Sequence, residues 1–244
     1  MSKKNRPVGR AERAAAALRE QEQVERRRRH LMVGGVVVTL LVIILGGFLL
    51  SRALDTSDDV HAPAAGEGDH GLTLGPAGAP HEVVIYEDFL CPYCGELEAA
   101  SRADLARLAA DGKVRVEYRP FNLLSSIGDY SERSAAAFAV VLDTAGPDVA
   151  KKLHDLLYEN QPSEAGPFPS DDDLVGLAVE AGADEADVRR GLEAGDGKTW
   201  VSEATQAALD AGVEGTPTVL LDGKVFRDGR TMQDLASNLV DELS

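Results

Sequence analysis

The chain has 244 residues and a net charge of −16, which is very unevenly distributed. Residues 1–30 carry ten Lys/Arg and four Glu, whereas residues 51–244 carry 15 Lys/Arg and 37 Asp/Glu. The length allows one or two domains, and the acidity of the long C-terminal part excludes nucleic-acid binding, because such a surface repels phosphate.

The N-terminal part predicts a membrane anchor. The basic cytoplasmic tail, residues 1–30, ends in Arg26–Arg29 and His30, and the twenty residues Leu31–Leu50 carry no charge. As a helix this run is about 30 Å long, the thickness of the hydrocarbon core of a bilayer. The basic flank predicts a single transmembrane helix at 31–50 with a cytoplasmic N-terminus. A cleaved signal peptide is the alternative, although its apolar region is normally shorter.

Residues 51–80 predict a flexible linker. They are rich in Ala, Gly, Pro, Asp and His and show no periodicity. A flexible chain of this length spans roughly 30 Å. The domain that follows, residues 81–244, would therefore be tethered to the membrane and extracytoplasmic, where disulfide bonds persist.

The remainder predicts one α/β domain. A mostly apolar stretch at Val83–Phe89 indicates a buried strand, an amphipathic helix follows to about residue 110, and Val114–Tyr118 alternates as a second strand. A helical insertion then occupies about 128–211. Its expected helices are 131–143, 147–158, 171–181, 185–192 and 199–209. A hairpin around Asp222-Gly223 and a last helix end the chain, so one sheet with packed helices is the economical solution.

Cys91 and Cys94 are the only cysteines of the chain, and they lie where the first strand gives way to the first helix. A C-x-x-C at such a junction indicates redox chemistry. The free amides and the dipole at the helix start would lower the pKa of Cys91 below the ordinary value of about 8.5. Pro92 suits the first helical turn because it lacks an amide hydrogen. We therefore expect an exposed, reactive Cys91 and a shielded, resolving Cys94.

Four further residues are candidates for a role in the domain. Tyr93 either tunes the cysteines and touches substrate or is an exposed filler. Thr216-Pro217 precedes the hairpin, and the residues alone favour a trans bond there because few X–Pro bonds are cis. Trp200, the single tryptophan, is expected to pack within the helical insertion.

Residues 81–244 resemble the DsbA-like branch of the thioredoxin superfamily. The features that match are the strand leading into Cys91-Pro92-Tyr93-Cys94, the helical insertion, Thr216-Pro217 before a hairpin and the closing helix. The resemblance implies a thioredoxin fold in which Pro217 is cis and faces the cysteines. It also implies that Thr216 offers backbone groups to an extended substrate strand.

The chain departs from the superfamily pattern at one position. Many members carry a buried carboxylate six residues before the first cysteine, where this chain has Ile85. Glu87 and Asp88 lie closer to the motif. Asp88 either assists proton transfer or has an ordinary strand-end or capping role. The departure concerns proton transfer and leaves the thiol exchange itself unaffected.

These observations predict an extracytoplasmic thiol–disulfide oxidoreductase without a cofactor. A stabilised Cys91 thiolate is a good leaving group, so we expect an oxidase that donates the Cys91–Cys94 disulfide to exported proteins with free thiols. The resemblance implies reoxidation by a membrane quinone-linked partner of the DsbB or vitamin K epoxide reductase kind.

The sequence leaves several alternatives to this function. A disulfide reductase or isomerase on the same fold stays open, as does a tethered binding module in which the cysteines are incidental. A glutaredoxin shares Cys-Pro-Tyr-Cys but lacks the anchor and the insertion. Zinc binding is disfavoured because a second cysteine pair is missing and His154 is the only histidine well inside the domain.

Overall fold

The computed structural model describes residues 60–68 and 70–244, together with Met32 and Ile43. The predicted tail, and all of the predicted transmembrane helix except those two residues, lie outside this part. Within the described residues, no helix is long and apolar enough to cross a bilayer.

The described domain is built on a mixed sheet in the order β1-β3-β2-β4-β5. Its strands are β1 (Leu72–Leu74), β2 (His81–Glu87), β3 (Val114–Pro120), β4 (Thr218–Leu221) and β5 (Lys224–Val225). β2 and β3 are parallel, and the other neighbours are antiparallel. Residues 83–86 of β2 are buried on both faces, as expected for a central strand. β2 ends at Glu87, so Asp88 and Phe89 lie in the loop that leads to the cysteines.

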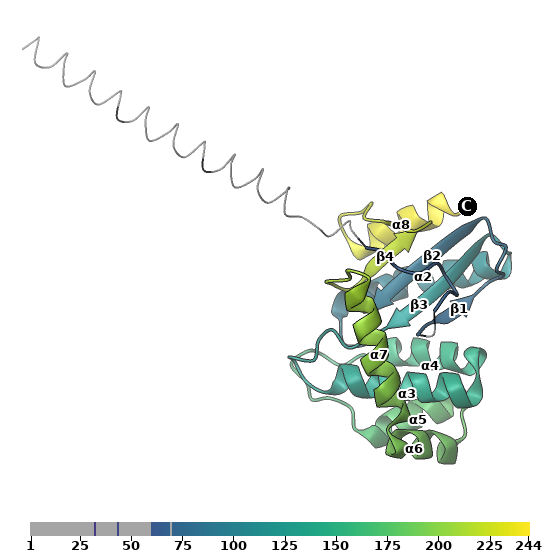
Figure 1. The fold of residues 1–244 in the computed structure, drawn as a ribbon, viewed down its shortest axis with the longest axis vertical. Helices are drawn as coiled ribbons and strands as arrows, with labels where there is room; N and C mark the ends of the chain where they lie inside the picture. The colour runs from purple at the N-terminus through teal and green to yellow at the C-terminus, as the bar shows by residue number, and fades with distance from the viewer. Residues whose placement is uncertain (1–31, 33–42, 44–59, 69) are drawn as a thin grey trace, which may run out of the picture. The chain divides into compact units, whose positions relative to one another are not determined.

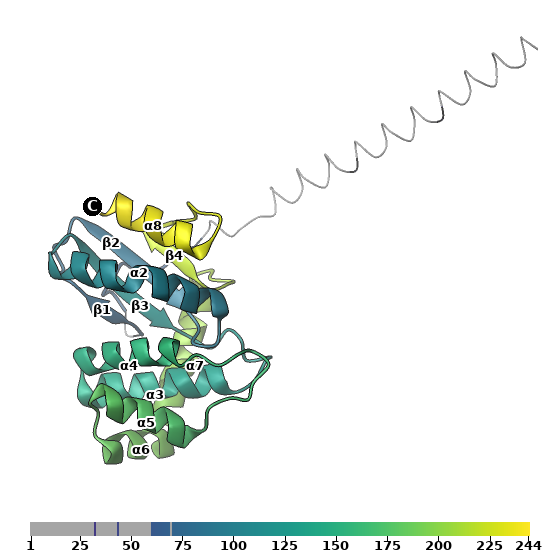
Figure 2. The same cartoon turned by 180° about the vertical axis from the view of Figure 1, so that it is seen from behind.

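Helices form the other layers. They are α2 (Pro92–Ala110), α3 (Tyr130–Ala145), α4 (Pro147–Glu159), α5 (Asp171–Ala181), α6 (Glu185–Ala194), α7 (Asp196–Asp210) and α8 (Met232–Glu242). Figure 2 shows α2 and α8 together on one face of the sheet. Helices α3–α6 gather beyond one end of the sheet, and α7 returns from them toward β4 (Figure 1). This is an α/β thioredoxin-like fold with the expected helical insertion.

The stretch before residue 81 corrects the linker prediction. Leu72 pairs with Tyr118 in the antiparallel β1–β3 ladder. Val60 and Ala65 are buried in a small core with Val84, on the face of the sheet opposite α2. The described part of residues 60–80 is therefore folded onto the domain. β1 has only three residues, too few for alternation to reveal a strand.

Local signals explain why the insertion helices begin and end near the predicted residues. At α5, the Ser170 side chain accepts a hydrogen bond from the Asp173 amide, and the Asp173 carboxylate accepts one from the Ser170 amide. This capping box fixes the helix start. Gly182 ends the same helix with a φ of 112°, a conformation that other residues rarely adopt.

The predicted hairpin joins β4 and β5 through Asp222 and Gly223. Their φ values are 50° and 76°, so both lie in the left-handed region that a two-residue hairpin turn requires. The Asp222 carboxylate also accepts hydrogen bonds from the Glu82 amide, at 2.9 Å, and faces the His81 ring, at 3.0 Å. The turn is thereby attached to the start of β2.

Candidate active site

The two cysteines lie at the junction between β2 and α2. Cys91 is the residue before the helix and has extended backbone angles (φ −70°, ψ 117°), and Pro92 is the first helical residue. The amide of Cys91 donates to the Asp88 carbonyl over 2.9 Å, which closes the turn between strand and helix. Cys94 lies one turn further along, on the side of α2 that faces the core.

Both cysteines are covered, which corrects the expectation that Cys91 is exposed. Cys91 is 5 % exposed and Cys94 is 2 % exposed, and both are free thiols. By contrast, the neighbouring Tyr93 side chain is 60 % exposed. Pro92, which also lies between the two cysteines, is exposed as well.

The cysteines differ in how their thiolates are stabilised. A hydrogen bond from the Cys94 thiol is the largest cause that lowers the pKa of Cys91 to about 6, and burial opposes it. Contact with Thr216 and the amides of Cys94 and Tyr93 lower this pKa further. Burial raises the pKa of Cys94 well above its ordinary value. The sequence predicted the direction at Cys91, but it assigned the cause to the helix start alone.

Thr216 and Pro217 lie beside the cysteines. The Cys91 thiol donates to the Thr216 carbonyl over 3.4 Å, and the Thr216–Pro217 bond is cis, as the resemblance implied. Antiparallel pairing of β4 with β2, which places Thr218 opposite Tyr86, brings these segments together. A groove of about 340 Å³ lies next to them, with Val60 and Glu214 also in its lining.

Asp88 makes the contacts that its strand-end alternative predicts. Its carboxylate accepts hydrogen bonds from the Leu90 amide at 2.8 Å, the Ser131 hydroxyl at 2.7 Å and the amides of Leu123 and Leu124 at 2.9 Å each. Burial raises the pKa of Asp88, and these bonds oppose the rise. The side chain is fully buried. It ties the cysteine turn to the loop that precedes α3.

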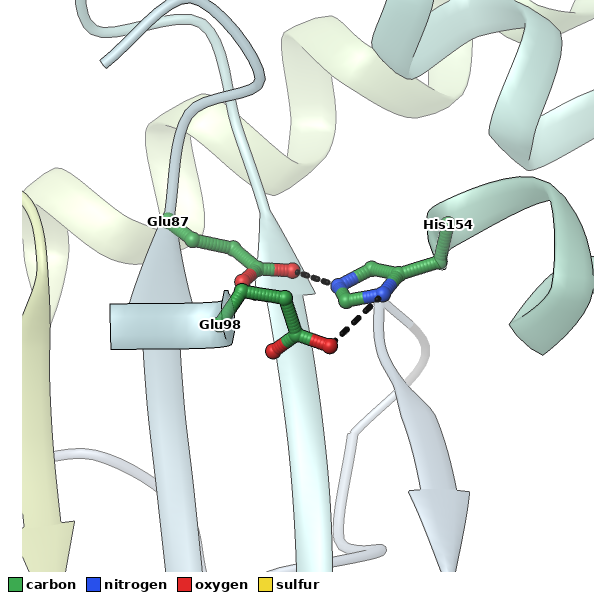
Figure 3. A group of neighbouring side chains, drawn as sticks. All are labelled: Glu87, Glu98 and His154. Carbon is green, nitrogen blue, oxygen red and sulfur yellow. Dashed lines mark hydrogen bonds and ion pairs between the residues drawn. The ribbon is translucent and has the colours of Figure 1, made fainter. Parts of the chain in front are cut away.

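Glu87 belongs to a separate buried cluster of charges, drawn in Figure 3. His154 Nε2 lies 2.6 Å from a Glu87 oxygen, and His154 Nδ1 lies 3.7 Å from a Glu98 oxygen. Lys151 Nζ lies 3.5 Å from Glu98 and also pairs with Asp155. Strand β2 and helices α2 and α4 each contribute at least one member of this cluster.

The cluster is arranged around a protonated imidazole. Burial disfavours the charge on His154, but the carboxylates of Glu87 and Glu98 outweigh burial and raise its pKa to about 9. The ring faces a carboxylate through each nitrogen, so neither nitrogen presents a free lone pair. Lys151 supplies a second cation. The three potential ligands Glu87, Glu98 and His154 therefore fit an ion-paired cluster better than a metal site.

Two of these groups were not identified from the sequence. Glu98 is a charged residue of the amphipathic helix α2, where a solvent-facing position is expected, but it is only 3 % exposed. Glu98 has helical spacing with Ser101, Leu105 and Leu108, so it falls within the buried stripe. His154 shares the buried face of α4 with Leu153 and Leu157. A polar residue inside an apolar stripe was the signal available in the sequence.

A protein-family model and several solved structures are similar to this chain. The family model described as Thioredoxin matches residues 67–242. The solved structure of oxidised DsbA from Mycobacterium tuberculosis is 27% identical, with a TM-score of 0.60, over 71% of this chain and 90% of the other. The reduced disulfide bond oxidoreductase DsbG from the same organism is 28% identical, with a TM-score of 0.61, over 73% and 88%.

A curated relative of a different description also matches. The Na(+)/H(+) antiporter NhaA 1 of Salinispora arenicola is 32% identical over 180 residues, which are 73% of this chain and 25% of that protein. The chain thus spans about a quarter of the length of the first curated relatives that it matches.

Proposed function

This chain belongs to the thioredoxin superfamily as a DsbA-like thiol–disulfide oxidoreductase, and from that premise we propose that it is an oxidase that donates the Cys91–Cys94 disulfide to exported proteins. The contrast between the two cysteines supports the proposal most directly. The pKa of Cys91 is lowered to about 6 and that of Cys94 is raised. Stabilising the reduced form in this way raises the reduction potential, and a pair with a high potential donates its disulfide.

The reaction proceeds in two exchanges. A substrate thiolate attacks the Cys91 sulfur of the disulfide, the S–S bond breaks, and Cys94 leaves and takes up a proton, as its raised pKa favours. A second substrate thiolate then attacks the substrate sulfur of the mixed disulfide. Cys91 leaves as a thiolate, and the substrate keeps the new disulfide. Two electrons pass from the substrate to the cysteine pair.

Thr216 and Pro217 would hold the substrate during these exchanges. The Thr216 carbonyl already contacts the Cys91 sulfur, and Thr216 and Pro217 also line the groove of about 340 Å³. An extended substrate strand that pairs with Thr216 would bring its own sulfur to Cys91. Main-chain pairing of this kind tolerates many substrate sequences.

The location and the reoxidising partner are part of the proposal. Leu31–Leu50 would anchor the chain, with the N-terminus in the cytoplasm and the domain outside it. A membrane quinone-linked reoxidase would restore the disulfide. A fusion of alkaline phosphatase, which needs disulfides for activity, to residue 244 tests this topology: an active fusion is expected, and an inactive one contradicts it.

The redox state of the pair distinguishes an oxidase from a reductase or isomerase. Rapid alkylation of thiols in cells should find Cys91 and Cys94 mostly oxidised, and equilibrium with glutathione should give a potential nearer about −120 mV than about −270 mV. A pair that is mostly reduced in cells would contradict the oxidase. Replacement of Cys94 by Ala should trap mixed disulfides through Cys91, whereas the reciprocal Cys91→Ala should trap none.

A further inference from the structure

Gln161 joins the helical insertion to the turn that carries Cys91. It follows the end of α4, and the nitrogen of its side-chain amide donates to two carbonyls, those of Phe89 and Cys91, over 2.9 Å each. Gln161 is partly buried. The two carbonyls lie on either side of Leu90, so one amide group spans the turn between β2 and α2.

Two backbone amides also donate to the Cys91 carbonyl, and one of them has a second acceptor. The Cys94 amide lies 3.1 Å from this carbonyl oxygen, and the Gly95 amide lies 3.2 Å from it. The Cys94 amide also contacts the Cys91 sulfur and stabilises its thiolate. The carbonyl and the sulfur of Cys91 therefore compete for one N–H group. A third donor on the carbonyl weakens its hold on the Cys94 amide and leaves that amide to the sulfur.

Gly95 makes room for this arrangement. A Cβ atom at residue 95 would lie 2.5 Å from Oε1 of Gln161, closer than any such contact allows. Glycine in the first turns of a helix costs about 1 kcal/mol relative to alanine. The chain thus has an unfavourable helix residue at the position where the Gln161 amide needs the space.

We propose that Gln161 is a positioning residue that fixes the Cys91 turn and directs the Cys94 amide to the Cys91 sulfur. The inference rests on the proposed thiol chemistry, but it concerns the thiolate alone and not the direction of electron flow. Gln161 touches neither sulfur in this arrangement. It acts through the Cys91 carbonyl, and the end of α4 thereby influences the reactive cysteine.

The test is a titration of thiolate absorbance at 240 nm between pH 4 and pH 8 on the reduced full chain. Of the two thiols, only that of Cys91 ionises in this range, because the pKa of Cys94 lies well above it. Gln161→Met keeps the length of the side chain and removes both hydrogen bonds. We expect the midpoint to rise by about half to one pH unit, with a matching decrease in the rate of alkylation near pH 6.

Asn160→Ala is the matched control. Among the described residues, the Asn160 side-chain amide donates to the Leu156 carbonyl of α4 alone, so its loss should leave the midpoint unchanged. If Gln161→Met lowers the melting temperature but does not move the midpoint, Gln161 is only structural and the proposal fails. If Gln161→Met does not fold, Gln161→Ala gives a second reading, because it also removes both hydrogen bonds without adding a charge and should also raise the midpoint.

A double-mutant cycle tests the contact itself. Gly95→Ala should displace the Gln161 amide and raise the midpoint, but it should add little in a Gln161→Ala background, since the amide is already gone. Additive shifts would show that Gly95 and Gln161 act independently and would overturn the proposed mechanism. A low reduction potential would refute the oxidase and leave this titration unaffected, so the two proposals fail separately.

Discussion

Cys91 and Cys94 are chemically identical residues three positions apart, and their surroundings alone distinguish them. Cys91 accepts hydrogen bonds from the Cys94 thiol and from backbone amides at the start of α2, whereas burial is the largest influence on Cys94. Donors around a sulfur favour its thiolate, and burial favours the thiol. The pair therefore ionises in one step over the neutral range, at Cys91.

The first prediction concerns the pH dependence of this ionisation. The rate at which iodoacetamide alkylates reduced Cys91 should rise with pH and reach half of its plateau near pH 6, because the pKa of Cys91 is lowered to about 6. Mass spectrometry of the labelled peptide measures the rate at each pH. Cys94→Ala should shift the midpoint upward, since the Cys94 thiol is the largest cause of the lowering. A midpoint near 9 in the unmodified chain would contradict this description.

The second prediction separates the role of Asp88 from proton transfer. Asp88→Asn keeps the shape of the side chain but replaces one acceptor oxygen by a donor that faces amide groups. We expect a loss of about 2–4 kcal/mol in the free energy of unfolding, because buried amides or the Ser131 hydroxyl then lack an acceptor. Urea denaturation measures the loss.

The Cys91 midpoint in the same variant is the control for that prediction. The Asp88 carboxylate joins the cysteine turn to the start of α3, and it contacts neither cysteine sulfur. The midpoint should therefore stay within a few tenths of a unit of pH 6. A normal stability combined with a large shift would favour the proton-transfer role instead.

At the scale of elements, the segment before β2 is part of the domain and not a spacer. β1 extends the sheet beyond β3, and Val60 and Ala65 cover apolar residues of β2 on the face opposite α2. An uncovered sheet edge and an apolar face in contact with water are both unfavourable. The folded unit therefore needs residues that composition alone assigns to a linker.

The third prediction follows from this boundary. A chain that begins at His81 should unfold at a markedly lower urea concentration than one that begins at Ser57, with a difference of roughly 3 kcal/mol or more for the lost strand and buried side chains. Leu72→Ala is the smaller change, and it should cost about 2–4 kcal/mol because Leu72 is fully buried. Equal stability of the two chains would restore the linker interpretation.

At the scale of the whole molecule, the Glu87–His154–Glu98 cluster binds the insertion to the thioredoxin core. Its members come from β2, α4 and α2, and Phe89 packs against the His154 ring with centroids 5.7 Å apart. Removing one partner from a buried ion pair leaves the other charge uncompensated, which is costly. The stability of the contact between the insertion and the thioredoxin core therefore depends on the charges that both parts contribute to the cluster.

The fourth prediction is a loss of stability at alkaline pH. The folded-state pKa of His154 is raised to about 9 from an ordinary value of 6.5. A raised pKa contributes its full stability below about pH 6.5, and the contribution is lost as the pH rises through about 9. The free energy of unfolding from urea denaturation should decrease across this window by about 1–3 kcal/mol.

His154→Gln is the matched variant for that measurement. It should be less stable than the unmodified chain at pH 6 by about 3–5 kcal/mol, since Glu87 and Glu98 lose their buried cation. Its stability should also change less between pH 6.5 and pH 9. A variant that retains the same pH dependence would show that another group causes it.

The sequence by itself determined the features that depend on neighbouring residues. Apolar periods, capping residues and the Asp222-Gly223 turn predicted the helices and the hairpin, and the position of Cys91-Pro92-Tyr93-Cys94 at a strand–helix junction predicted the redox site. Each of these signals acts over a few residues, and so it can be seen in the chain alone.

Only the tertiary structure decided the contacts between distant segments. The bonds of His154 to Glu87 and of Gln161 to Cys91 join residues 67 and 70 positions apart, and β1 is a strand only because β3 lies beside it. The hydrogen bond from Cys91 to Thr216 joins residues 125 positions apart. Such contacts arise when the folded chain brings its segments together, so no local pattern records them.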